Sequence, residues 1–254
     1  MPRRLFYGSE ESQHGHWYPG DADKPVVTVV HGGYWRNLYT MTMESAVAKD
    51  LNRRGYPVWN IEYRRVGEPG VHWPILGQDV LAAIDYADAN LVKAGQIVVA
   101  HSAGATLGVW AAAQREHLLG AVSRAGVLDL IERGDGDQSM RLLFDLAPNA
   151  NLRLVKRVFA EASPVSRMPF KTPVRVLHGR NDQTVPYQLS EWFIDNARKN
   201  GMDATLQIIE TEGHDEFLDP ASKSHAATVA AIEELAARSP ADRNAPSAAG
   251  GRSD

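Results

Sequence analysis

The chain has 254 residues, of which 44% are hydrophobic and 23% charged, and its formal net charge is −4 at pH 7. A chain of this size and composition can bury one substantial core, so we expect a single domain over residues 1–238. The small negative charge gives no electrostatic reason to expect nucleic acid or an anionic membrane as the main partner. Because cysteine is absent, disulfides, thiolate nucleophiles and thiolate zinc sites are excluded.

Apolar runs and helical periodicities alternate along the chain. Strands are expected at residues 25–31, 58–61, 96–101, 120–124, 174–178 and 204–209, and helices at residues 41–54, 74–91, 105–114, 187–199 and 222–237. Strands separated by helices predict an α/β fold with a mainly parallel central sheet and helices on both faces. In such folds, ligands bind in the loops at the carboxyl ends of the strands.

Two segments depart from this alternation. Residues 132–163 hold two short apolar stretches among charged residues and glycines, which predicts a small helical insertion. Such a segment either covers a site as a lid or only packs against the rest of the domain, and the sequence favours neither. Residues 239–254 are rich in proline, glycine and small polar residues, and we expect a disordered tail there.

The N-terminus lacks the apolar core of a signal peptide, and no apolar run is long enough to span a bilayer. We therefore expect a cytoplasmic protein with no membrane partner. The sequence leaves open whether the chain acts alone or as a homodimer.

Residues 98–104 (Val-Val-Ala-His-Ser-Ala-Gly) end an apolar run in a serine between small residues, and a helical stretch follows at once. This pattern is typical of a nucleophile elbow, where a sharp strand-to-helix turn exposes the serine hydroxyl to substrate and base. Ala100 and Gly104 suit such a turn, although Ala100 replaces the usual first glycine. The alternative is a small-residue turn that only lets a helix pack closely on a sheet.

A nucleophilic serine at position 102 needs a general base and a group that orients the base. Asp182 lies in the polar loop after the strand at 174–178, and His214 lies in the loop after the strand at 204–209. Taken alone, Asp182 is explained as a turn cap and His214 as a surface residue. Their order along the chain is nevertheless that of the α/β-hydrolases, so the sequence predicts a Ser102–Asp182–His214 triad.

Acyl transfer also needs hydrogen-bond donors for the developing oxyanion. The backbone N–H of Ala103, directly after the serine and at a helix N-terminus, is one expected donor. The second is expected in the loop after the first long strand, where Gly32 and Gly33 let the backbone turn its N–H groups toward the pocket. Gly33, with Tyr34 beside it, is the best candidate, and an ordinary strand-end turn is the alternative.

Together these motifs resemble the esterase and arylformamidase branch of the α/β-hydrolases over residues 5–236. The His31-Gly32-Gly33-Tyr34-Trp35 stretch is similar to the HGGxW motif of kynurenine formamidases and their bacterial relatives. The resemblance implies an α/β-hydrolase fold, the triad above, oxyanion stabilisation by backbone N–H groups, and no metal or other cofactor. It also implies hydrolysis of a small carboxylic ester or an N-formyl arylamine.

The candidate substrate-binding residues are Trp35, Tyr63, Trp73 and His101, all near the expected mouth of the site. An aromatic leaving group suits this set, although core packing explains each aromatic residue equally well.

The adjacent Arg64 and Arg65 offer a contact for a substrate carboxylate, but solvated surface arginines are the favoured interpretation. His72, His178 and His225 are expected to be structural, and for His101 a structural role is the alternative to substrate binding, because no carboxylate or histidine partner at metal-ligand spacing accompanies any of them.

Two other functions fit parts of the pattern. A peptidase of the prolyl oligopeptidase type has the same triad order, but this chain has no room for the propeller that normally gates such enzymes. A non-catalytic ligand-binding protein on the hydrolase fold would keep the pocket. The presence of Ser102, Asp182 and His214 together argues against that second alternative.

Overall fold

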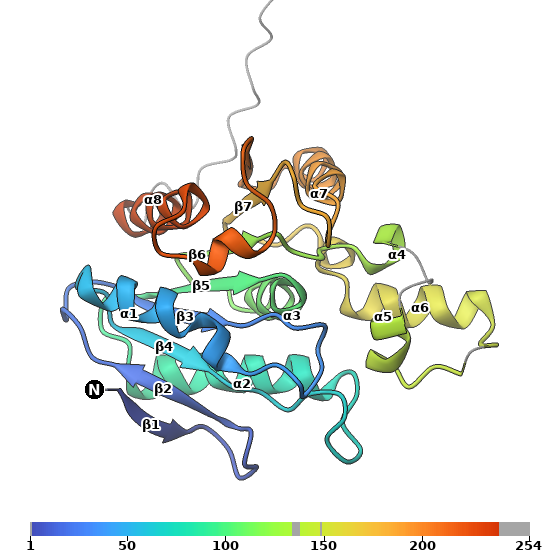
Figure 1. Cartoon of the computed structure of the whole chain (residues 1–254), viewed down its shortest axis with the longest axis horizontal. Coiled ribbons are helices and arrows are strands. Elements are labelled where there is room, and N and C mark those ends of the chain that lie inside the picture. The colour runs from blue at the N-terminus through green and yellow to red at the C-terminus, as the bar shows by residue number, and fades with distance from the viewer. Residues whose placement is uncertain (1, 134–137, 148, 239–254) are drawn as a thin grey trace, which may run out of the picture.

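The computed structural model describes residues 2–133, 138–147 and 149–238, and these residues form an eight-stranded sheet with helices on both faces (Figure 1). The strands are β1 (Arg3–Phe6), β2 (His14–Tyr18), β3 (Val26–Val30), β4 (Val58–Ile61), β5 (Gln96–His101), β6 (Gly120–Arg124), β7 (Val174–Gly179) and β8 (Ala204–Ile209). Their order across the sheet is β1-β2-β4-β3-β5-β6-β7-β8. The six strands expected from the sequence are all present within one residue of the expected bounds, which confirms the predicted fold class.

Strands β3 to β8 pair in parallel, whereas β1 and β2 add to one edge as antiparallel strands. The sequence does not predict this edge hairpin. Strand β1 is mostly exposed and reads Arg-Arg-Leu-Phe, and β2 reads His-Gly-His-Trp-Tyr. Neither has the β-branched run that marks a strand buried on both faces, because an edge strand needs little apolar surface.

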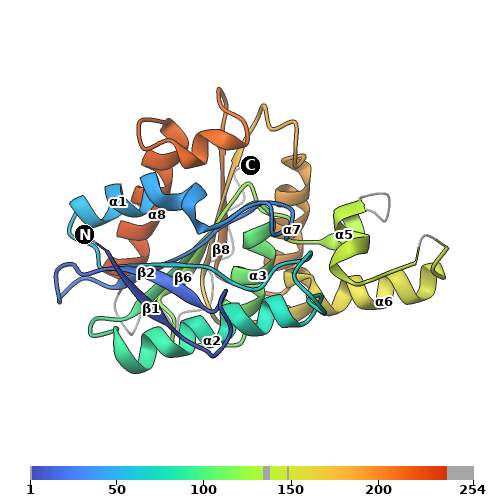
Figure 2. The ribbon, with the colours of Figure 1, turned by 60° about the horizontal axis from the view of Figure 1, so that its bottom comes forward.

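Helices cover both faces of the sheet. Helices α1 (Ser45–Arg53) and α8 (Lys223–Ala237) pack on one face, and α2 (Ile75–Asn90), α3 (Ala103–Ala112) and α7 (Gln188–Lys199) pack on the other (Figure 2). Three short 3-10 helices, η1 (Met41–Glu44), η2 (Pro164–Arg167) and η3 (Asp215–Leu218), lie in the connections. Among the described helices, none combines the length and the apolar character needed to cross a bilayer.

The alternation of side chains along β3 divides the core into two layers. Val27 and Val29 contact the layer under α1 and α8, while Val26 and Val30 contact the layer under α2 and α3. Successive side chains of a strand point to opposite faces, so a strand covered on both faces must be apolar throughout. This requirement explains the uninterrupted aliphatic and threonine sequence of β3.

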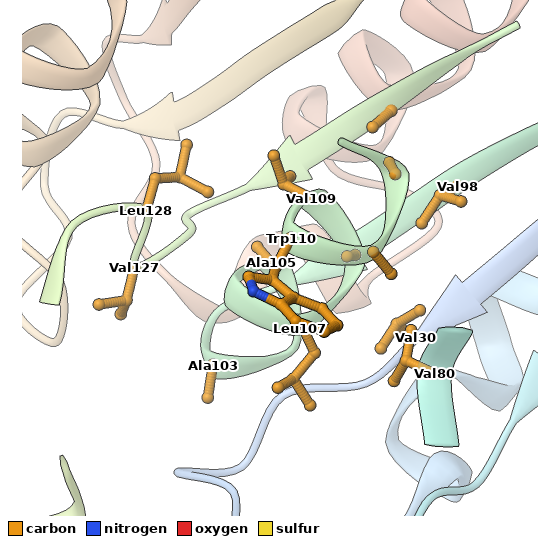
Figure 3. Packing of buried hydrophobic residues seen from close by; sticks show 14 of the residues in the cluster. Val30, Val80, Val98, Ala103, Ala105, Leu107, Val109, Trp110, Val127 and Leu128 are labelled. Carbon is orange, nitrogen blue, oxygen red and sulfur yellow. The ribbon is translucent and has the colours of Figure 1, made fainter. Parts of the chain in front are cut away.

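Helix α3 is buried along its whole length (Figure 3). Leu107 and Trp110 pack with Val30 and Val80 in the cluster between the sheet and α2, and each fully buried aliphatic side chain contributes about 1.5–3 kcal/mol of apolar burial. The helix begins directly after Ser102. Its packing therefore fixes the position of that serine on the sheet.

Asp50 joins the two helices on the opposite face. Its carboxylate on α1 accepts hydrogen bonds from Arg54 at 2.7 Å, from His225 of α8 at 2.9 Å and from Arg53 at 3.0 Å. Burial alone would raise the pKa of Asp50, but these three hydrogen bonds outweigh burial and lower the pKa from 3.8 to about 2. The ionised carboxylate therefore links α1 to α8 throughout the neutral range.

The expected insertion forms helices α4 (Leu130–Arg133), α5 (Gln138–Leu143) and α6 (Leu152–Ala162), which lie at the carboxyl end of the sheet (Figure 1). Met140, Leu143, Val155 and Phe159 are buried against the main core. The insertion is thus anchored by its own apolar residues. Residues 134–137 and 148 within it, and the tail expected over 239–254, lie outside the described part of the chain.

Candidate active site

Ser102 occupies the sharp turn between β5 and α3. Its backbone has φ 54° and ψ −127°, and its N–H donates to the carbonyl oxygen of Arg124 at 2.9 Å. Positive φ is uncommon for a residue with a side chain, and such outliers cluster at functional sites. A Cβ on Gly104 would lie 2.2 Å from the carbonyl oxygen of His31, so glycine is required there.

The alanine in place of the first elbow glycine is accommodated by α3. A Cβ at Gly108 would come within 2.8 Å of the Ala100 methyl group. The absence of a side chain at position 108 therefore leaves the room that the methyl group occupies. The residue without a side chain therefore stands in the helix, at Gly108, instead of in the strand, and α3 still packs closely on β5.

The structure brings together the three side chains of the triad expected from the sequence. Nε2 of His214 lies 2.9 Å from Oγ of Ser102, and Nδ1 of His214 lies 2.7 Å from Oδ2 of Asp182. Each residue stands in the loop after a parallel strand, namely β5, β7 and β8. The arrangement can pass a proton from the serine hydroxyl to an imidazole whose tautomer is set by a carboxylate.

Asp182 is held by four donors. Oδ1 accepts the backbone N–H groups of Thr184 and Val185, both at 2.8 Å. Oδ2 accepts from His214 and, at 3.0 Å, from Nε2 of His178. Burial raises the pKa of Asp182, but the hydrogen bonds from His178 and His214 outweigh it, so that the pKa lies well below its usual range. The Asp182 carboxylate is therefore ionised at neutral pH, where it can accept the hydrogen bond from Nδ1 of His214.

His178 supports this carboxylate, a contact that the sequence interpretation does not assign. Its Nε2 faces Asp182 and the carbonyl oxygen of Val185, and its Nδ1 lies 2.7 Å from Oγ of Ser190 on α7. Two acceptors at Nε2 require a proton there, which leaves Nδ1 to accept from the Ser190 hydroxyl. The sequence signal for this contact is the position of His178 at the end of β7, four residues before Asp182.

The loop after β3 has three consecutive residues with positive φ: Gly33 at 103°, Tyr34 at 54° and Trp35 at 59°. Gly32 packs directly on the nucleophile, because a Cβ there would lie 2.9 Å from Cβ of Ser102. Within the part of the chain that the structure describes, no acceptor bonds the backbone N–H groups of Gly33, Tyr34 and Ala103. These donors are therefore free for an oxyanion beside Ser102.

A small cavity of about 20 Å³ adjoins the nucleophile. Its described lining includes Tyr34, Trp35, Ser102, Ala103, Val127 and Met140. A cavity of this kind needs roughly 10–15 Å³ to hold one water molecule. The space beside Ser102 is therefore large enough for a water-sized group.

Of the four residues expected to bind substrate, Trp35 lines this cavity. Its indole ring is 2% exposed, and its buried Nε1–H has no acceptor among the described residues. A buried indole donor is normally hydrogen-bonded. Trp35 therefore lies at the cavity with a buried indole donor that has no described partner.

The other three expected substrate contacts are wrong, because these side chains belong to the protein interior. Tyr63 is completely buried, and its hydroxyl donates to the carbonyl oxygen of His31 at 2.9 Å. Trp73 packs edge-on against Trp110 with ring centroids 4.9 Å apart. His101 is buried, and its Nε2 lies 3.1 Å from the carbonyl oxygen of His214.

The two arginines after β4 both form ion pairs, and neither is among the described residues that line the cavity beside Ser102. Arg64 makes a bidentate contact with the buried carboxylate of Asp79 at 2.7 and 2.8 Å. Arg65 pairs with Glu62 at 3.0 Å and with Glu68 at 3.1 Å. The expectation of a solvated surface arginine is therefore wrong for Arg65, which is buried, whereas the Arg64 side chain is 24% exposed.

A wider hollow of about 970 Å³ opens along Glu10, Asn37 and Arg64, but its lining does not include Ser102. The described residues also contain no group of three or more histidine, aspartate or glutamate side chains placed to hold a metal ion. The chemistry that the described site itself offers is therefore that of the serine, the imidazole, the carboxylate and the free backbone donors.

Comparison with known proteins gives a consistent picture. The model of the prolyl oligopeptidase family matches residues 75–237, and no curated protein matches the chain. Three similar solved structures are esterases. A truncated carbohydrate esterase from gut microbiota has a TM-score of 0.79 and 18% identity, over 92% of this chain and 95% of that chain. An esterase from Thermogutta terrifontis has a TM-score of 0.71 and 18% identity, over 92% and 91% of the two chains. Esterase B from Lactobacillus rhamnosis has a TM-score of 0.75 and 14% identity, over 92% and 87%. These likenesses agree with the α/β-hydrolase fold expected from the sequence.

Proposed function

The chain belongs to the prolyl oligopeptidase family, and we propose that it hydrolyses small esters or N-formyl arylamines through an acyl-enzyme at Ser102. That it is a serine hydrolase with an α/β-hydrolase fold agrees with the family match and with the esterase structures. The observation that carries the proposal is the hydrogen-bonded series from Ser102 through His214 to Asp182, beside a cavity of about 20 Å³.

In the proposed reaction, Nε2 of His214 takes the proton of Ser102 as Oγ attacks the substrate carbonyl carbon. The negative charge that develops on the carbonyl oxygen is met by the backbone N–H groups of Gly33 or Tyr34 and of Ala103. Asp182 keeps the proton on Nδ1 of His214 and stabilises the imidazolium. The imidazolium then protonates the leaving alcohol or amine, which departs and leaves the acyl group on Ser102.

The second half of the reaction repeats these roles with water. Nε2 of His214 takes a proton from a water molecule, whose oxygen attacks the acyl carbon. The same backbone donors stabilise the second oxyanion. The acid leaves when Oγ of Ser102 takes back its proton from His214, so each group returns to its starting state.

The size of the cavity supports a short acyl group. A formyl or acetyl group matches a space that holds about one water molecule, and the bulk of such a substrate would be its leaving group. The sequence resembles the arylformamidases, and the similar solved structures are named as esterases. Both kinds of enzyme catalyse acyl transfer. Which leaving group the protein accepts is the finer part of the proposal.

A peptidase is the second candidate, because the family match itself favours it. Cleavage after proline would place a prolyl ring on the acyl side of Ser102. The small cavity directly beside Ser102 favours an acyl group that is shorter than a prolyl residue. A non-catalytic binding protein is the third possibility, and it predicts no turnover at all.

One rate comparison separates these functions. We expect kcat/KM to be highest for N-formylkynurenine or for p-nitrophenyl acetate, and to fall steeply for p-nitrophenyl butyrate and for aryl amides of proline dipeptides. Ser102→Ala is the matched control and should abolish all of these activities. A strong preference for short esters over the formamide would reject the formamidase assignment, and preferred cleavage of the proline amide would establish the peptidase. If neither protein turns over any substrate, the enzymatic proposal is wrong.

A further inference from the structure

His31 is a completely buried histidine directly behind the proposed oxyanion loop. It follows β3, and Glu62 follows β4, at the point where Val30 and Ile61 are paired in the parallel register. The strand register therefore places the two residues side by side. Nε2 of His31 lies 2.7 Å from Oε1 of Glu62, and Nδ1 lies 2.7 Å from the carbonyl oxygen of Gly32.

Both ring nitrogens of His31 thus face oxygen atoms at hydrogen-bond distance. A neutral imidazole has one donor and one acceptor nitrogen, whereas the imidazolium has two donors. The carbonyl oxygen of Gly32 can only accept, so Nδ1 must donate. Nε2 lies against the Glu62 carboxylate, which holds the ring in this orientation.

Glu62 has the surroundings of an ionised carboxylate. Its Oε1 also accepts the backbone N–H of Tyr63 at 3.2 Å, and its Oε2 accepts the backbone N–H of Met41 at 3.1 Å and pairs with Arg65 at 3.0 Å. Burial raises the pKa of Glu62, but the hydrogen bond and charge of His31, the charge of Arg65 and the Met41 N–H together hold it below its usual range.

We propose that the buried pair of His31 and Glu62 positions the oxyanion loop for catalysis. In a trans peptide unit the C=O and N–H point in opposite directions. By binding the carbonyl oxygen of Gly32, Nδ1 of His31 turns the N–H of Gly33 away from the sheet interior. The proposal rests on the oxyanion role given above to this loop, and it adds the residue pair that sets the direction of the donor.

The charged groups around His31 are consistent with a stable ion pair. Glu62 and Arg65 approach from the segment after β4, and the Tyr63 ring stacks on the imidazole with centroids 4.5 Å apart. Burial raises the pKa of Tyr63 far above its usual value, so this neighbour is neutral. His101 borders the loop from β5, since a Cβ on Gly32 would lie 3.4 Å from its Nδ1. Burial and the charges of nearby groups lower the pKa of His101, so it adds no competing positive charge.

The kinetic test uses two glutamates that differ in one contact. Glu62 and Glu68 both pair with Arg65, but only the Glu62 carboxylate contacts His31. Glu62→Gln replaces the carboxylate that contacts the His31 ring, and Glu68→Gln replaces a carboxylate that does not contact it. We expect Glu62→Gln to lower kcat for p-nitrophenyl acetate about tenfold to a hundredfold with KM nearly unchanged, since the full loss of an oxyanion donor costs about 10²–10³-fold. Glu68→Gln should stay within about twofold of the parent protein.

The fall in kcat at a nearly unchanged KM separates positioning from a merely structural role. An equal loss of kcat in both variants would contradict the proposal.

A measurement on the unmutated protein does not depend on turnover or on how a variant folds. ¹⁵N NMR of the histidine rings, with the His31 signals assigned through their loss in His31→Asn, reports the protonation of each ring nitrogen. We expect Nδ1 of His31 to carry a proton at pH 8. An unprotonated Nδ1 would overturn the inference, whereas a failure to hydrolyse any ester with Nδ1 protonated would count against the proposed function alone.

Discussion

Replacing Asp182 with asparagine is expected to trap His214 in the wrong tautomer. Oδ1 of Asp182 accepts the backbone N–H groups of Thr184 and Val185, both at 2.8 Å. The asparagine must turn its carbonyl oxygen toward these two donors, because its NH₂ group cannot accept a hydrogen bond. The NH₂ group then takes the place of Oδ2, which lies 2.7 Å from Nδ1 of His214.

A donor at that position favours the His214 tautomer with an unprotonated Nδ1 and a protonated Nε2. This Nε2 cannot take the proton of Ser102, so the general base is lost. The same tautomer error in a serine triad costs about 10⁴-fold in kcat, or about 5 kcal/mol. We expect a fall of this size in the release of p-nitrophenol from p-nitrophenyl acetate at neutral pH, with little change in KM.

Asp203→Asn is the matched control, because Asp203 is an ion-paired aspartate 2.9 Å from Arg175 at the start of β7. It should retain nearly full kcat. If Asp182→Asn remains within tenfold of the parent protein, the proposed dependence of His214 on the Asp182 carboxylate is refuted. Circular dichroism melting of both variants distinguishes a catalytic loss from unfolding.

Three further changes probe the acyl cavity, the oxyanion loop and the contact between α1 and α8. Met140→Ala enlarges the cavity beside Ser102, so the kcat/KM ratio of p-nitrophenyl butyrate to acetate should rise about tenfold; an unchanged ratio would show that the cavity does not hold the acyl group. Gly33→Ala places a methyl group 2.3 Å from Cβ of Tyr39 at a φ of 103°, and displacement of the oxyanion donor should lower kcat about a hundredfold in the same ester assay. Asp50→Asn should lower the free energy of unfolding by about 2 kcal/mol at pH 7, because folding depresses the pKa of this group from 3.8 to about 2. The stabilisation by Asp50 is present above the unfolded pKa and is lost as the pH falls through the folded pKa, so urea titrations of the two proteins should converge between pH 4 and pH 2 and a constant difference would contradict the assignment.

The sequence was most informative where a chemical requirement coincides with a strand end. Ser102, Asp182 and His214 each follow a parallel strand, and parallel strands end at the same edge of a sheet. Their proximity therefore follows from the order of strands and helices alone. The same reasoning located the glycine loop after β3 and the helical insertion beside the site.

The contacts within the core could not be predicted in this way. Whether Tyr63, Trp73 and His101 face the pocket or the interior depends on side-chain direction and packing, which the order of elements does not fix. The Tyr63 side chain lies in the interior, where its hydroxyl donates to the carbonyl oxygen of His31.

The hydrogen bond between His31 and Glu62 depends on the register in which Val30 pairs with Ile61. Once that register is known, the two polar residues that follow the paired strand ends can be expected to meet. The polar network behind the active site therefore follows from strand pairing, which the sequence alone leaves undetermined.

The central claim is that Ser102 carries the acyl group during turnover. The direct measurement is mass spectrometry of peptides from the protein quenched in acid during hydrolysis of p-nitrophenyl acetate. We expect the peptide that contains Ser102 to gain one acetyl group, and the corresponding peptide of Ser102→Ala to gain none. Acetylation at another residue, or turnover by Ser102→Ala at the parent rate, would contradict the account.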